Sequence, residues 1–149
     1  MTRALFLLCA AAAGALPGLA ALGGSTESVV ADQVRFQAKR KMVTLPDYTV
    51  HEISRDDGGV IREYVTPAGK VFGVSWNGPT IPDLTQLLGS YRAEFRDTLL
   101  AQPKSFGRRP AAVHNSELVV ETGGHMHAFQ GRAYLNSMLP AGVSPETIK

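Results

Sequence analysis

Two turn signals divide residues 48–77 into three strand-like segments, and this pattern constrains the fold more than any other feature. Residues 56–59 (DDGG) supply positive-φ positions for a tight reversal. Residues 66–69 (TPAG) have the Pro and Gly placement of a type I turn. Short connections force neighbouring strands to run antiparallel. The sequence therefore predicts an antiparallel meander with strands at 48–55, 60–66 and 70–77.

A long amphipathic helix is predicted after this meander. Asp83 with Gln86 three residues later is a capping-box pattern, and Gln102-Pro103 ends the helix. Its apolar stripe consists of Leu84, Leu87, Leu88, Tyr91, Phe95 and Leu99. In the third strand, alternation predicts Phe72, Val74 and Trp76 on one face, and Gly73 and Ser75 on the other. We expect the stripe to pack on the face with Trp76, which gives a two-layer core.

The remaining elements complete an α+β fold. Residues 104–115 form a polar, basic connection without periodicity, followed by a short strand at 118–121, a turn at 122–124 and a long strand at 125–135. The prediction for residues 47–149 is a single α+β domain. Its antiparallel sheet has about five strands (three-strand meander, helix, hairpin), with one main amphipathic helix packed on one face.

Residues 21–46 are predicted to be an N-terminal helical and linker segment. Ser25 or Thr26 can cap a helix whose imperfect apolar stripe runs to about Lys39. The basic cluster at 39–41 is expected to face solvent, and Pro46 closes the segment. We interpret this as a short helix packed on the domain rather than a basic helix lying on anionic lipid.

The first twenty residues have the order of a secretory signal peptide. Arg3 is followed by an uncharged apolar run at 4–16, a break at Pro17-Gly18 and small residues up to Ala20. Cleavage near Ala20 predicts a periplasmic or secreted protein. The run is too short for a membrane span, which needs about 20 apolar residues, and no second run follows, so no transmembrane segment is expected after cleavage.

Charge and cysteine content exclude several classes of protein. The chain has 15 Lys and Arg against 13 Asp and Glu, and this balance does not predict a nucleic-acid partner. Cys9 is the only cysteine and leaves with the signal peptide. Leu8 stands where a lipidated cysteine would need a small residue, which argues against a lipoprotein. The mature chain therefore has no disulfide and no thiol nucleophile.

The histidines are the candidate metal ligands. His125 and His127 are two residues apart, so on a strand both imidazoles would point to one face. His51 and His114 are possible third and fourth ligands for zinc or copper. The alternative is that the pair at 125 and 127 sits where the core meets solvent. Both interpretations remain open at this point.

Other motifs favour structural interpretations. Ser75 lacks the Gly spacing and the strand-to-helix turn of a nucleophile elbow, so it is interpreted as a solvent-facing strand serine. Glu52 and Glu63 are expected to pair with Arg55 or Arg62 across strands. Asp56 and Asp57 are interpreted as turn residues. Residues 76–79 (WNGP) form either an aromatic–proline binding surface or, with Trp76 under the helix, part of the core; the alternation favours the core.

Several stretches, taken together, resemble one known family. They are, in order, residues 21–24 (ALGG), 48–52 (YTVHE), 62–65 (REYV), 76–79 (WNGP), 82–84 (PDL), 124–126 (GHM), 131–134 (GRAY) and 139–143 (LPAGV). The chain resembles a family of small exported proteobacterial proteins described only as a domain of unknown function, DUF2844. This resemblance implies export in a Gram-negative organism, and it transfers no activity, cofactor or catalytic residue.

Three functions are consistent with the sequence. The first is a non-catalytic periplasmic binding or accessory module, whose partner is an envelope protein or ligand. The second is a metal-binding protein using His125 and His127. The third, an enzyme, has no motif that supports it.

Overall fold

The computed structural model describes residues 22–103 and 111–149. The predicted signal peptide, with Arg3, Cys9 and the cleavage site at Ala20, lies outside the described residues. So does most of the basic connection, residues 104–110. Within the described part of the chain, no helix has the length and apolar character needed to cross a membrane.

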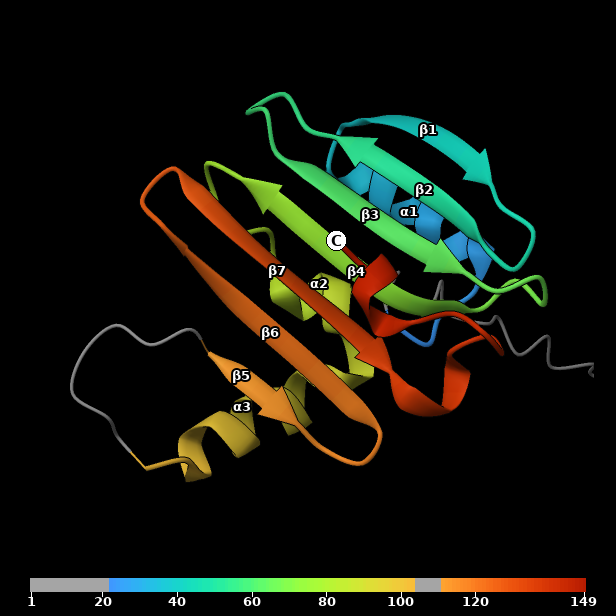
Figure 1. The fold of residues 1–149 in the computed structure, drawn as a ribbon. Coiled ribbons are helices and arrows are strands. Elements are labelled where there is room, and N and C mark those ends of the chain that lie inside the picture. The colour runs from blue at the N-terminus through green and yellow to red at the C-terminus, as the bar shows by residue number, and fades with distance from the viewer. Residues whose placement is uncertain (1–21, 104–110) are drawn as a thin grey trace, which may run out of the picture.

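A single antiparallel sheet runs through the molecule (Figure 1). It has seven strands rather than the predicted five or so, in the order β1-β2-β3-β4-β7-β6-β5. The strands are β1 (Lys39–Thr44), β2 (Thr49–Ser54), β3 (Val60–Val65), β4 (Val71–Gly78), β5 (Ala112–His114), β6 (Leu118–His125) and β7 (Ala128–Leu135). The α+β class is confirmed, and the strand count was too low because both edge strands were missed.

The meander β2-β3-β4 is confirmed together with its turns. The Asp57 carboxylate accepts a hydrogen bond from the Gly59 N–H at 2.9 Å. The Gly69 N–H donates to the Thr66 carbonyl at 2.8 Å, and Gly69 has a φ of 76°, which glycine adopts without strain. Turn chemistry is local, so the sequence alone identifies it.

The edge strands β1 and β5 carry no alternating pattern long enough to be recognised in the sequence. All six residues of β1 are exposed, so the strand is defined by main-chain pairing with β2 alone. It includes the basic cluster at 39–41, which is exposed as predicted but lies in a strand rather than in a helical or linker segment. β5 has only three residues and pairs with β6. β1 has no buried face to impose a period of two, and β5, in which only Val113 is buried, is too short to display one.

The β6–β7 hairpin turns at Met126-His127, three residues later than predicted. Gly123 and Gly124 are strand residues paired with Gln130 and Phe129. A Cβ on Gly124 would lie 2.1 Å from the Ala128 carbonyl oxygen. Glycine at position 124 therefore allows the two backbones to approach closely. In the sequence, the same Gly-Gly pair resembles a turn signal.

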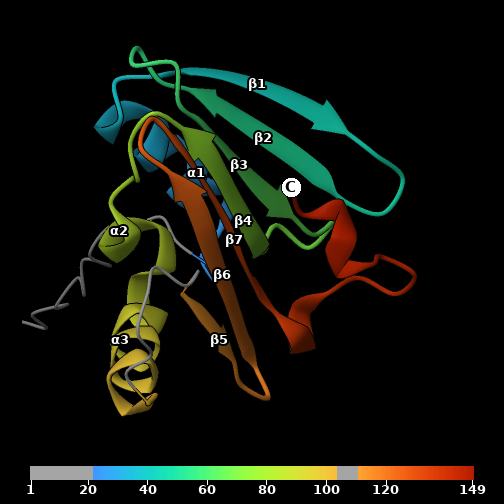
Figure 2. The same cartoon turned by 60° about the vertical axis from the view of Figure 1, so that its left-hand side comes forward.

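Three helices cover one face of the sheet: α1 (Thr26–Arg35), α2 (Leu84–Leu88) and α3 (Arg92–Ala101) (Figures 1 and 2). The predicted helix after Asp83 is broken by a 3-10 turn, Gly89–Tyr91, where Gly89 has a φ of 51°. The predicted stripe nevertheless packs in one core. Leu87, Leu88 and Phe95 are buried in it, and Leu84, Tyr91 and Leu99 pack against it.

A β-bulge in β4 corrects the predicted faces of that strand. The register shifts between Tyr64, which pairs with Gly73, and Val65, which pairs with Val71, so Phe72 is the extra residue. Val74 and Trp76 face the helices, as predicted, whereas Phe72 lies in the second core on the opposite face. The predicted alternation of side chains between the two faces of β4 is therefore wrong at Phe72.

The opposite face of the sheet, called here the outer face, is covered by the C-terminal segment 136–149 (Figure 2). Two 3-10 turns shape this segment, Asn136–Met138 and Pro145–Thr147. Ile148 is fully buried, and a Cβ on Gly73 would lie 2.8 Å from its Cδ1. Ser75 faces this side and is 2% exposed, so its interpretation as a solvent-facing serine is wrong.

Candidate functional site

A cleft of about 580 Å³ lies beside the C-terminal segment, over β4, β7 and β6. Asn77, Gln130 and Arg132 come from the central strands, Glu121 from β6 and Ala112 from β5, and Ile148 forms part of the wall. On the outer face, Asn77 pairs with Gln130, and Arg132 pairs with Glu121. The volume is in the range of small-molecule sites.

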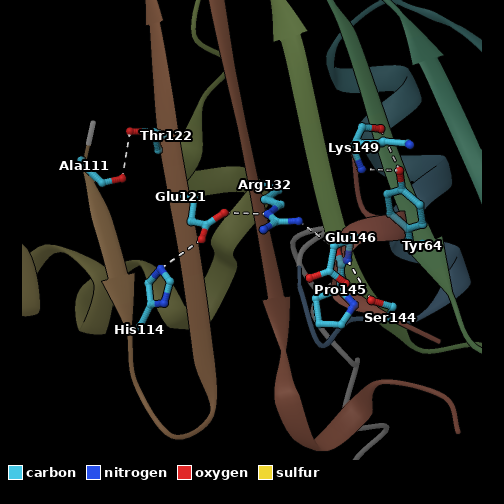
Figure 3. Close-up of polar contacts among 10 residues, drawn as sticks. All are labelled: Tyr64, Ala111, His114, Glu121, Thr122, Arg132, Ser144, Pro145, Glu146 and Lys149. Atoms are coloured by element: carbon cyan, nitrogen blue, oxygen red, sulfur yellow. Dashed lines mark hydrogen bonds and ion pairs between the residues drawn. The ribbon is translucent and has the colours of Figure 1, made fainter. Parts of the chain in front are cut away.

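Glu121 is held on both carboxylate oxygens (Figure 3). Oε2 accepts a hydrogen bond from the Arg132 Nε at 2.7 Å, and Oε1 lies 3.1 Å from the His114 Nε2. The hydrogen bond and positive charge of Arg132, with a smaller contribution from His114, hold the pKa of Glu121 below its usual value. The carboxylate is therefore ionised and fixed in orientation at neutral pH.

Arg132 links the cleft floor to its wall. Its Nη1 donates to the Pro145 carbonyl at 2.9 Å (Figure 3). Its guanidinium carbon lies 5.9 Å from the centre of the Tyr134 ring. The bonds from Nε to Glu121 and from Nη1 to Pro145 use two of its five N–H donors, so three donors remain for water or a ligand. The Arg132 side chain is therefore fixed in orientation and can still donate hydrogen bonds to a ligand.

The C-terminal wall is anchored a second time, at Lys149. Its N–H donates to the Tyr64 hydroxyl at 3.1 Å, and its main-chain oxygen accepts from that hydroxyl at 3.0 Å (Figure 3). Arg62 Nη1 donates to the same oxygen at 3.3 Å. Two strands of the sheet, β3 and β7, thus hold the segment that closes one side of the cleft.

The chemistry of the cleft suits a neutral polar ligand. The charges of Glu121 and Arg132 neutralise each other, so this pair offers hydrogen bonds without a net charge, and Lys149 adds one cationic side chain at the wall. The exposed amides of Asn77 and Gln130 each carry donors and an acceptor. Ala112 and Ile148 add apolar contact area. These features favour binding of hydroxyl or amide groups.

The predicted histidine ligands are distributed over the molecule. His51 is buried in β2 and His114 lies in β5, which is five strand spacings away, or about 24 Å. His125 ends β6, six residues beyond the Val119 that pairs with His114, or about 20 Å. The structure brings only His125 and His127 near each other.

The predicted strand geometry of that pair is wrong. His125 pairs with Ala128, and His127 lies in the turn with a φ of 65°, so the two imidazoles do not share a strand face. Among the residues that the structure describes, no three His, Cys, Asp or Glu side chains are grouped to hold a metal ion. Binding of zinc or copper by His125 and His127 stays a prediction.

The predicted ion pairs are correct in part. Arg62 Nε donates to Glu52 at 2.9 Å across β2 and β3. Arg55 instead pairs with Asp57 within its own turn, at 2.7 Å. Glu63 points to the helix-covered face and is 1% exposed, so its predicted place in a surface charge ladder is wrong. Trp76 is 3% exposed within the core, as predicted.

Gln130 and Arg132 are the site residues that sequence reasoning missed. They alternate along β7 on the outer face, and this alternation was the available signal. Their partners Asn77 and Glu121 are distant in sequence and meet them only through strand register.

The chain belongs to the DUF2844 family, described as a protein of unknown function, whose model matches residues 18–148. No curated protein and no solved structure matches the chain.

A second group of polar residues, also missed in the sequence, is buried between α1 and the sheet. Asp32 on α1 and Glu63 on β3 are 0% and 1% exposed, and Gln86 of α2 donates a hydrogen bond to Asp32. His51 of β2 pairs across strands with Glu63 and is also buried. Within the described residues, Glu63 in its ionised form finds no hydrogen-bond donor for either carboxylate oxygen.

The environment of this buried group favours neutral side chains. Burial raises the pKa of Glu63 well above its ordinary value of 4.5, and Asp32 raises it further through hydrogen bonding and its own charge, whereas the positive charge of Arg40 opposes the rise. Burial also raises the pKa of Asp32, although hydrogen bonds from Glu63 and Gln86 and the charge of Arg35 act against this. A proton on one acid supplies the donor that the pair lacks.

Raising the pH should therefore destabilise the fold through Glu63. The folded chain retains a proton that the unfolded chain releases above pH 4.5, so this contribution to stability is present below 4.5 and is lost as pH rises toward the folded pKa. The Glu63→Gln variant should gain in unfolding free energy relative to wild type between pH 5 and 8, by about 1 kcal/mol or more at pH 8. Urea unfolding at each pH measures this difference.

The matched control for this comparison is Glu52→Gln, the same substitution on the neighbouring strand in a half-exposed ion pair. His51 acts in the opposite sense, because burial lowers its pKa below 6.5 and its contribution is lost as pH falls. Comparison with wild type at each pH removes the part of this effect that is common to both proteins. A Glu63→Gln curve parallel to wild type at every pH would contradict the assignment.

Proposed function

We propose that this protein is an exported, non-catalytic binding module of the periplasm. Its ligand is a neutral molecule rich in hydroxyl or amide groups, which binds in the outer-face cleft. The observation that carries this proposal is the fixed Glu121–Arg132 pair that lines the cleft. A site whose polar groups are already positioned loses little conformational entropy on binding.

The contacts around this pair support binding rather than a purely structural role. Arg132 retains three N–H donors, and the exposed Asn77 and Gln130 amides flank it on the same face. A merely structural ion pair needs no adjoining cleft of about 580 Å³. The proposal rests on this combination of volume and convergent polar groups.

Export is proposed from the order of residues 1–20. Arg3, the apolar run at 4–16 and the small residues before Ala21 support recognition by a signal peptidase. Met1–Ala20 would be removed before the protein reaches its site of action.

Expression of the full chain in a Gram-negative host tests export. Intact-mass spectrometry of the periplasmic fraction should find a protein that begins at Ala21. Replacing the small residues in Gly18→Arg/Ala20→Arg should block cleavage and leave the precursor in the membrane fraction. Wild-type precursor retained uncleaved in the cytosol would contradict the proposal.

Filling the cleft should abolish ligand binding. Ala112→Trp places a large side chain in the cleft, whereas Ala93→Trp places the same side chain on the exposed surface of α3. Nuclear magnetic resonance titrations with neutral oligosaccharides and with capped neutral tripeptides should shift the amide signals of Asn77, Thr122 and Gln130 in wild type and in Ala93→Trp. Ala112→Trp should lose these shifts.

The two probe classes distinguish hydroxyl from amide recognition. Binding of either class at the cleft supports the proposal and identifies the ligand chemistry. Binding that Ala112→Trp leaves unchanged, or the absence of cleft shifts with both probe classes, would contradict it.

A further inference from the structure

The outermost strand β1 presents an open edge at the end of the sheet opposite β5 (Figure 1). Within the described residues, β1 pairs with β2 on one side and with no strand on the other. Its six residues are all exposed, and no proline or bulge interrupts the register from Lys39 to Thr44. Such an edge offers a row of main-chain donors and acceptors for a further strand.

The β1 edge is positively charged and lacks counter-charges. Lys39, Arg40 and Lys41 are consecutive, and none of them forms an ion pair within the part of the chain that is described. Lys41 lies opposite Glu52, but that carboxylate is already bonded to Arg62 at 2.9 Å. Lys39 and Lys41 are therefore free to meet carboxylates on an incoming segment, whereas the charge of Arg40 also acts on the buried Glu63.

Apolar side chains continue the β1 edge beyond its cations. Met42 is 61% exposed, Val43 is 43% exposed, and Leu45, just after the strand, is 38% exposed. Protection against aggregation accounts for lysines on an edge strand, but it does not account for exposed Met and Val at the adjacent positions. A basic half followed by an apolar half matches a partner of complementary composition.

We infer that the outer edge of β1 is a docking site for an extended segment of a partner protein with acidic and apolar halves. The segment adds to the sheet through main-chain hydrogen bonds. Its carboxylates lie opposite Lys39 and Lys41, which share the outer face, and its apolar side chains lie beside Met42 and Val43. This surface is separate from the outer-face cleft, so the inference stands independently of the proposed ligand.

A second copy of the chain is a poorer occupant of the same edge. Antiparallel pairing of two full β1 strands about their centre would place Lys39, Arg40 and Lys41 of one copy opposite the apolar half of the other, and neither strand carries a carboxylate. The cations of each copy would therefore gain no opposite charge across the strands. Charge complementarity therefore selects an acidic segment.

Synthetic peptides test the inference directly. The probe is a fluorescein-labelled octapeptide with an apolar half and an acidic half, Val-Thr-Val-Val-Glu-Thr-Glu-Thr, and its counterpart carries N-methyl groups on alternate amides, which block strand pairing along one edge. Fluorescence anisotropy should show binding of the unmodified peptide and a loss of about tenfold or more in affinity for an N-methylated peptide. Both possible methylation registers are tested, since the register of the complex is unknown.

Charge reversal supplies the second arm of the experiment. Lys39→Glu/Lys41→Glu should weaken binding of the acidic peptide by about tenfold or more and should favour a peptide with Lys in place of Glu. The control Lys70→Glu/Arg96→Glu makes the same change in net charge outside β1 and should retain binding. Circular dichroism checks that both variants are folded.

Three results would overturn the inference. The first is no binding, or equal binding of the N-methylated and unmodified peptides, because charge alone would then explain any attraction. The second is equal weakening by the two charge-reversal variants. The third is a concentration-dependent dimer in sedimentation that a β1 substitution, Val43→Asp, dissociates, because β1 would then be an interface between copies.

Discussion

The structure depends on a central strand that is buried on both faces. Residues 71–76 of β4 are all buried, with Val74 and Trp76 toward the helices and Gly73 and Ser75 toward the C-terminal segment. A strand of this kind is stable only if both faces of its sheet are covered. The helices supply one cover, and the C-terminal segment, anchored through Ile148 and Lys149, supplies the other.

The outer cover also creates the candidate binding site. The C-terminal segment covers part of the outer face, and polar residues of β4, β6 and β7 line the cleft beside it. Arg132 joins the two parts, since it bonds to Glu121 on the sheet and to Pro145 in the cover. A ligand in the cleft would therefore contact both the sheet and the segment that stabilises it.

Local sequence signals predicted most of the fold. The errors arose where a segment has no local pattern, or where contacts depend on strand register. The meander follows from the turns at 56–59 and 66–69, and the stripe from Leu84 to Leu99 correctly indicates a helix-covered face. β1 was missed because all of its residues are exposed, and β5 because three residues are too few to show alternation. The position of the β6–β7 turn was missed because Gly124 serves close backbone packing.

Glu121 and Arg132 are eleven residues apart and meet only through register, and the burial of Glu63 under α1 leaves no local pattern.

The claim that the C-terminal segment stabilises the sheet by covering its outer face can be tested by truncating one buried side chain in that segment. Ile148 is fully buried on the outer face, whereas Leu100, of the same size, is 77% exposed on α3. In urea unfolding, Ile148→Ala should lower the unfolding free energy by about 2–5 kcal/mol, and Leu100→Ala should change it by no more than about 0.5 kcal/mol. Equal, small effects of the two substitutions would show that the C-terminal segment does not stabilise the sheet, and would contradict this account.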